Sequence, residues 1–176
     1  MDGHLEKNLV ASCREGNTLA YTGLVKSYSR HVFAICFGML GNSHDAEDVA
    51  QQVLITGFTD ISRLRNGDQF GPWIGQIAKN KCVDFIRKQQ RQRHGQNSLA
   101  ERPAANIREP KEYPELQAAL ARLPEEHRLP LMLYYFSGQS TEKIADTLAI
   151  SLDAVRTRMS RARKHLRELL STKGGA

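Results

Sequence analysis

The sequence predicts an all-α protein of two small helical domains joined by a flexible linker, the second a helix-turn-helix domain. Apolar residues recur at intervals of three and four in both halves, which is the spacing of one helical face. A polar stretch over about residues 94–113 has too few apolar side chains to form a core. We therefore expect a first domain over residues 1–93 and a second over residues 114–176.

Composition limits the function classes. The chain has 176 residues and a formal net charge of +6, which favours a polyanionic partner such as nucleic acid. Its three cysteines, Cys13, Cys36 and Cys82, are too far apart to indicate a disulfide framework or a zinc site. No apolar window is long enough to cross a bilayer, and the amino terminus does not resemble a secretory signal. We expect a cytoplasmic protein with reduced thiols and no membrane insertion.

In the first domain, the pattern predicts a helix over about residues 5–14 and a long second helix that begins near Asn17. Gly41 and Asn42 interrupt the pattern, and Ser43 is the expected cap of a third helix over residues 45–58. The outward face of this third helix carries Asp45, Asp48, Gln52 and Ile55. Interaction with the helix dipole explains the acidic residues, but an exposed Ile55 indicates a protein-docking surface.

A fourth helix opens at Phe70, with Pro72 in its first turn. Its apolar stripe leaves basic and amide side chains on the other sides. Phe70 and Trp73 lie at the start of this helix beside cationic side chains, an arrangement that can stack unpaired bases. For Trp73 the sequence leaves two interpretations open, a core residue or a base-stacking one. The candidate nucleic-acid contacts are Phe70, Trp73, Lys79, Asn80 and Arg87.

The second domain begins near Pro114. Pro124 opens a nearly wholly apolar helix, which Pro130 is expected to bend because proline cannot donate the usual backbone hydrogen bond. Ser140 and Ser151 are then good caps for two further helices. Their short separation predicts two helices that cross through a tight turn.

The last helix has a buried seam and an opposite face suited to a DNA major groove. A step of about 100° per residue aligns the apolar residues Val155, Met159, Ala162, Leu166 and Leu169. The opposite side carries Asp153, Thr157, Ser160, Arg161 and Lys164, with Arg156 and Arg167 on its flanks. We expect base contacts from Arg156, Thr157, Ser160 and Arg161, and a phosphate contact from Lys164. The alternative is an amphipathic helix with an ordinary solvated face.

Three blocks, over residues 45–58, 70–87 and 123–163, together resemble the extracytoplasmic-function (ECF) group of bacterial sigma factors, which direct RNA polymerase to promoters. The resemblance implies that the first domain binds the clamp of the largest polymerase subunit and that residues 70–87 open the minus-ten promoter element. It implies that the second domain reads the minus-thirty-five element and docks on the flap of the second-largest subunit. The polymerase-binding residues would be Asp45, Asp48, Gln51, Gln52 and Ile55. An anti-sigma factor is a further partner that the resemblance raises.

Two residues depart from the family pattern. Ala149 stands in the turn where glycine is common, and Gln52 stands where an acidic residue is common. A left-handed Ala149 would cost about 1 kcal/mol relative to glycine. Gln52 would lose any salt bridge to the polymerase clamp.

The sequence predicts binding without catalysis and without a cofactor, because no phosphate loop, nucleophile with a partnered base, or metal-ligand cluster is found. Two other hypotheses remain. One is a helix-turn-helix repressor or activator that binds operator DNA as a dimer. The other is a metal-dependent nucleic-acid enzyme built on Asp45, Glu47 and Asp48, although Glu47 leaves the helix face that the two aspartates share.

Overall fold

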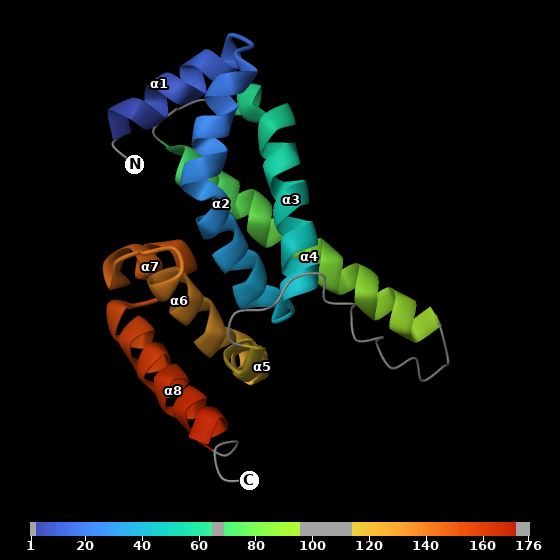
Figure 1. The fold of residues 1–176 in the computed structure, drawn as a ribbon, viewed down its shortest axis with the longest axis vertical. Helices are drawn as coiled ribbons and strands as arrows, with labels where there is room; N and C mark the ends of the chain where they lie inside the picture. The colour runs from blue at the N-terminus through green and yellow to red at the C-terminus, as the bar shows by residue number, and fades with distance from the viewer. Residues whose placement is uncertain (1–2, 65–68, 96–113, 172–176) are drawn as a thin grey trace.

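A computed structural model describes residues 3–64, 69–95 and 114–171, and these residues form eight α-helices and one 3-10 turn, η1 (Ile61–Arg63) (Figure 1). The all-α prediction is confirmed for this part of the chain. None of the helices in these ranges has both the length and the apolar character needed to span a bilayer. Residues 94 and 95 of the expected linker belong to a helix, and residues 96–113 lie outside the described ranges.

The first four helices are α1 (Gly3–Arg14), α2 (Thr18–Leu40), α3 (Ser43–Thr59) and α4 (Phe70–Gly95). The long α2 packs against each of the other three and supplies buried residues such as Leu24, Val32 and Ile35. Asn17 caps α2 as predicted, because its side chain accepts hydrogen bonds from two backbone amides of the first turn. The cap predicted at Ser43 is wrong.

Asn42 is the residue that caps α3, through hydrogen bonds from the backbone amides of His44 and Asp45. Ser43 is already the first helical residue. Gly41 takes the left-handed conformation with φ of 71°, which ends α2 and leaves Asn42 extended at the start of α3. Only Gly41 and Asn42 therefore separate α2 from α3, whereas the sequence pattern also places Ser43 outside the helix.

The last four helices are α5 (Pro114–Arg122), α6 (Glu125–Tyr135), α7 (Thr141–Leu148) and α8 (Leu152–Ser171). Ser140 and Ser151 cap α7 and α8, since each hydroxyl accepts from the backbone amide three residues later. Ala149 has φ of 54° and ψ of 45°, so the turn between α7 and α8 does require a left-handed residue. The backbone of Ala149 is therefore strained, because residues other than glycine disfavour this conformation.

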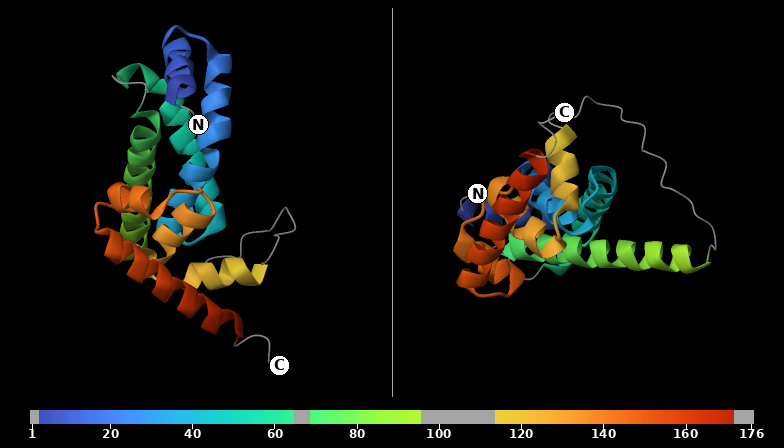
Figure 2. Two further views of the ribbon diagram at one scale, coloured as in Figure 1. Left: turned by 90° about the vertical axis from the view of Figure 1, so that its left-hand side faces the viewer. Right: turned by 90° about the horizontal axis from the view of Figure 1, so that it is seen from below.

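The core continues from the first four helices into the last four. The apolar helix α6 packs along α2, so Met132 and Leu133 join the same buried cluster as Ile35 and Val10 (Figure 2). A helix that is apolar on most sides needs neighbours on more than one side. Helix α6 meets this need by lying between α2 and α8.

Candidate nucleic-acid interface

The helix-turn-helix has the geometry that its sequence predicts. Val155, Met159 and Ala162 are at most 1% exposed and hold α8 against α6 and α7. The polar residues on the other side are all exposed, and we call them the reading face of α8: Arg156, Thr157, Ser160, Arg161 and Lys164. Three of the five are cationic, so the reading face can contact both base edges and phosphates.

Two ion pairs distinguish Arg156, which is available to DNA, from Arg158, which contacts another helix. Arg156 lies 3.7 Å from Asp153, and the two side chains are 61% and 93% exposed. Exposed pairs of this kind contribute about 0–1 kcal/mol, so Arg156 can exchange Asp153 for a DNA partner. Arg158 is only 32% exposed and lies 3.7 Å from Glu126 of α6. Arg158 therefore lies nearer the packed seam of α8 than Arg156 does.

The start of α4 differs from its prediction. Phe70 is 1% exposed and packs between Tyr21, Tyr28 and Trp73, so its ring is a core group and cannot stack on a base in this structure. Three aromatic rings from α2 and α4 surround Phe70. The position of Phe70 in the first turn of the helix does not by itself indicate this packing. Trp73 is half-buried, with its ring centre 5.7 Å from that of Phe70.

Glu6 is a structural residue that no local sequence pattern indicates. It is 7% exposed, and its Oε1 accepts from the backbone amide of Phe70 at 3.1 Å. The Tyr28 hydroxyl donates to its other oxygen, and burial together with this contact raises the pKa of Tyr28. A carboxylate at the start of α4 satisfies a free amide and complements the helix dipole.

Farther along α4, the remaining candidates divide into two groups. Asn80 and Arg87 are exposed, and Asn80 Oδ1 accepts from Gln76 Nε2 at 3.0 Å. Lys79 is half-buried, and its ammonium donates to the backbone oxygen of Thr147, at the end of α7. Burial lowers the pKa of Lys79. In this arrangement the ammonium of Lys79 bonds to the second domain.

The outward face of α3 is a candidate protein surface. Asp48, Gln51, Gln52 and Ile55 are exposed and Asp45 is half-exposed, with Ile55 at 64%. Phe58, one turn beyond Ile55, is 42% exposed and extends the apolar part of the surface. No group of three metal-capable side chains occurs in the described ranges, so Asp45, Glu47 and Asp48 do not converge as the enzyme hypothesis requires.

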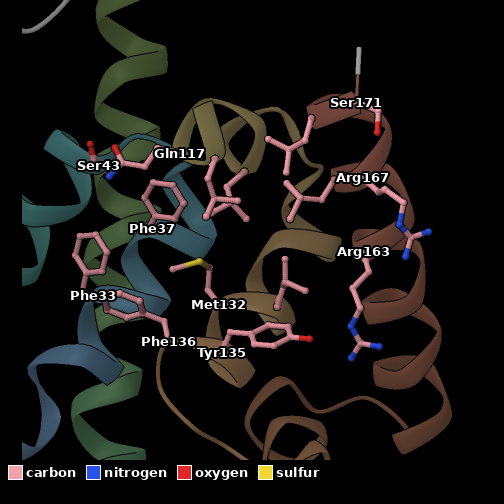
Figure 3. A pocket seen from close by; sticks show the side chains of 15 residues that line it. Phe33, Phe37, Ser43, Gln117, Met132, Tyr135, Phe136, Arg163, Arg167 and Ser171 are labelled. Carbon is pink, nitrogen blue, oxygen red and sulfur yellow. The ribbon is translucent and has the colours of Figure 1, made fainter. Parts of the chain in front are cut away.

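An apolar groove of about 880 Å³ lies where α2, α5, α6 and α8 meet. Phe33 and Phe37 of α2 lie on one side of it together with Phe136, the residue after α6, and the ring centres of Phe33 and Phe136 are 5.3 Å apart (Figure 3). Its lining side chains are largely aromatic and aliphatic, while the α8 side carries two arginines, Arg163 and Arg167. No local sequence pattern predicts this groove, because its walls come from both domains.

Two family models match the chain, Sigma-70 region 2 over residues 24–92 and Sigma-70 region 4 over residues 113–166. The chain is 32% identical over 161 residues to the ECF RNA polymerase sigma factor SigE of Mycolicibacterium smegmatis, covering 84% of this chain and 60% of that protein. It is 27% identical over 179 residues to the ECF RNA polymerase sigma factor SigW of Bacillus subtilis, covering 93% of this chain and 96% of that protein.

Solved structures agree on the fold. One similar structure is the sigma factor RpoE of Bartonella quintana in complex with the anti-sigma factor NepR, with a TM-score of 0.64, 24% identity, and coverage of 86% of this chain and 96% of that one. Another is CnrH in complex with the cytosolic domain of CnrY, with a TM-score of 0.63, 22% identity, and coverage of 96% and 98%. On these matches the chain belongs to the ECF group of RNA polymerase sigma factors.

Proposed function

We propose that this chain binds core RNA polymerase and carries it to promoters, where α8 reads the upstream element and α4 helps to open the downstream one. The observation that carries the proposal is the reading face of α8. All five of its predicted DNA contacts are exposed, while the buried Val155, Met159 and Ala162 hold the helix in place. A rigid helix with a polar, cationic outer side fits the major groove of duplex DNA.

The proposed role of α4 is to hold an unpaired base. Trp73 offers part of its ring, and Asn80 offers an exposed amide two turns along the same helix. Stacking and amide hydrogen bonds together can hold a base that has left the duplex. Arg87 extends the positive charge along the helix, where it can contact the backbone of the separated strand.

The proposed polymerase surface is the exposed face of α3. Its acidic and amide groups precede the exposed Ile55 and Phe58 along the helix, which suits a partner surface with basic groups beside an apolar patch. We assign this face to the clamp of the largest subunit. Gln52 can supply hydrogen bonds at this contact but no charge.

The apolar groove has a different proposed occupant, an amphipathic acidic helix of an anti-sigma factor. The groove offers an apolar floor to the apolar side of such a helix, and Arg163 and Arg167 can pair with its carboxylates. An occupant there would touch both domains at once. The similar structures that contain anti-sigma factors support an occupant of this class.

The test is transcription by core RNA polymerase on genomic DNA fragments, with the starts of the transcripts mapped. Transcripts that appear only when the chain is added, and that share two upstream sequence elements, are the expected result. Tight binding of the free chain to palindromic DNA, with repression and no new transcripts, would instead support a dimeric repressor. The mapped starts also define the promoter templates for the experiments below.

A further inference from the structure

A polar cavity of about 770 Å³ lies beside α4. Side chains from α2, α4, α7 and the segment between α6 and α7 line it. The lining includes three serines, two glutamines, two lysines and a histidine, most of which can donate hydrogen bonds. Cavities of about 300–1,000 Å³ hold small ligands. The size of the cavity and its excess of donors therefore suit a small ligand that is rich in acceptors.

Two lysines from different helices bring positive charge to this cavity. Lys79 of α4 is half-buried, and its ammonium donates to the backbone oxygen of Thr147, which leaves two of its three N–H groups for other acceptors. Lys143 of α7 is exposed and makes no ion pair within the described ranges. Burial lowers the pKa of His31, and the charges of Lys143 and Lys79 lower it further. The cavity thus disfavours another cation and favours an anion.

His31 has one ring nitrogen without a partner. Its Nδ1 lies 3.1 Å from Gln139 Nε2, and an amide nitrogen only donates, so Nδ1 is the acceptor. With a pKa of about 4 the ring is neutral at pH 7, and its single proton then lies on Nε2. Nε2 makes no hydrogen bond within the described ranges, although His31 is only 9% exposed. Gly75 also lines the cavity, and a Cβ there would lie 3.3 Å from Nε2, so the missing side chain leaves this N–H uncovered.

Two further polar groups suit the sugar and the base of a nucleotide. Asp146 of α7 is the one carboxylate among the lining residues, and it is exposed and can accept from sugar hydroxyls. Gln139 Oε1 is buried without a hydrogen-bond partner, and it can accept from an N–H group of a base. An inorganic phosphate would fill a small part of the cavity and would leave both groups unused.

We propose that this cavity binds a nucleotide that carries at least two phosphate groups. The phosphates bind the ammonium groups of Lys79 and Lys143, and the Nε2–H of His31 donates to a phosphate oxygen. Two cations from separate helices match the negative charges of a diphosphate. The sugar and the base extend towards Asp146 and Gln139. Among the lining residues only Lys79 is also a predicted DNA contact, so the site goes beyond the proposed function.

Isothermal titration calorimetry of the full chain with ADP and with GDP tests the site. Lys143→Gln should weaken binding about tenfold, the effect expected when a charged hydrogen bond is lost. The matched control is Lys26→Gln, which removes the same charge from an exposed position on α2 that does not line the cavity. Lys26→Gln should bind as the wild type does. Because both lysines are exposed, circular dichroism should show the same helicity in both variants.

Acylation of lysines, read by mass spectrometry, locates the bound nucleotide. Saturating ADP should protect Lys79 and Lys143 from acylation and leave Lys26 as reactive as before. Two fragments of ADP separate its parts. Adenosine lacks the phosphates and should not bind measurably. Inorganic pyrophosphate lacks the sugar and the base, and should bind about tenfold less tightly than ADP because it makes fewer hydrogen bonds.

The backbone of DNA is the other source of phosphate groups. A short single-stranded oligothymidine should bind the wild type and Lys143→Gln equally well. If its binding instead falls as much as that of ADP, the cavity is a contact for the DNA backbone, and the nucleotide assignment is overturned.

Three further results would overturn the proposal. They are no measurable binding of ADP or GDP, equal weakening by Lys143→Gln and Lys26→Gln, and pyrophosphate binding as tight as that of ADP. Equal weakening would mean that ADP binds the general positive charge of the chain. None of these measurements uses polymerase or a promoter, so they decide on the site even if the wild type directs no transcripts and the proposed function fails.

Discussion

Helices α8 and α4 both carry a predicted DNA face, and they differ in what else touches that face. All five predicted contacts on α8 are exposed to solvent. On α4, Phe70 is in the core, Trp73 is half-buried and Lys79 bonds to the second domain. Only Asn80 and Arg87 of the α4 group are fully outward.

The difference follows from the number of neighbours. Helix α8 lies at one edge of the molecule and packs on one side only, so its polar side remains open (Figure 1). Helix α4 packs against α2 and α3, and α7 approaches it from the other domain. Helical periodicity shows which residues share a face. It does not show which later part of the chain covers that face.

The largest expected effect concerns His31 of α2, which contacts Ser137 and Gln139 of the second domain. Burial, with Lys143 and Lys79 nearby, lowers the pKa of His31 from 6.5 to about 4. Between these values the unfolded chain binds a proton that the folded chain does not, so stability should fall as pH falls from 6.5 towards 4. The total loss is on the order of 3 kcal/mol. Lys79, Lys143 and Asp146 line the same cavity as His31.

Urea unfolding at pH 7.5, 6.0 and 5.0 measures this loss. His31→Gln cannot be protonated in this range, so its stability should vary less with pH than that of the wild type. Equal pH dependence in the two proteins would show that groups other than His31 cause the loss of stability as pH falls.

Much of the fold could be predicted from the sequence because local signals decide it. Asn17, Ser140 and Ser151 are caps that act within one helical turn, and Ala149 occupies a turn whose conformation its neighbours fix. The surroundings of Phe70 and Arg128 could not be predicted in this way. Their partners lie far along the chain, such as Glu6 for Phe70 and Gly38 for Arg128. Long-range packing of this kind leaves no periodic signal.

The second largest expected effect concerns promoter opening by the predicted DNA face of α4. Trp73→Ala or Asn80→Ala should reduce promoter opening, because the loss of one base stack costs about 1–3 kcal/mol. Permanganate reactivity of unpaired thymines measures the opening. Asn80 is exposed, so its substitution should leave the melting temperature nearly unchanged, which controls for any packing loss at Trp73. Normal opening with both folded variants would place the base pocket outside α4.

On α8, substitution of a residue that contacts bases should have a different effect from substitution of a residue that contacts phosphates. Arg156→Ala or Arg161→Ala should relax preference at particular upstream base pairs by about 1–3 kcal/mol, the value of a bidentate arginine–guanine pair. Lys164→Ala should weaken every promoter alike and reduce the salt slope by about one unit. Competition among single-base promoter variants at two salt concentrations distinguishes the two. The reverse pattern would mean that α8 is rotated from this assignment.

The smallest effect on stability is expected on α3, outside both DNA faces. Asp48→Arg changes an exposed side chain 3.7 Å from His44, so unfolding free energy should change by no more than about 0.5 kcal/mol. Polymerase affinity should nevertheless fall, because the substitution reverses a charge on the proposed docking surface. A pull-down titration with core polymerase measures it. Wild-type affinity would remove α3 as the interface.

The contrast between the two helices is tested most directly by transcription from matched templates, one fully duplex and one already unpaired at the downstream element. If α8 reads duplex DNA and α4 opens it, the unpaired template should restore transcription by Asn80→Ala but not by Arg161→Ala. Rescue of Arg161→Ala by the unpaired template, with Asn80→Ala still defective, would contradict the assignment of the two faces.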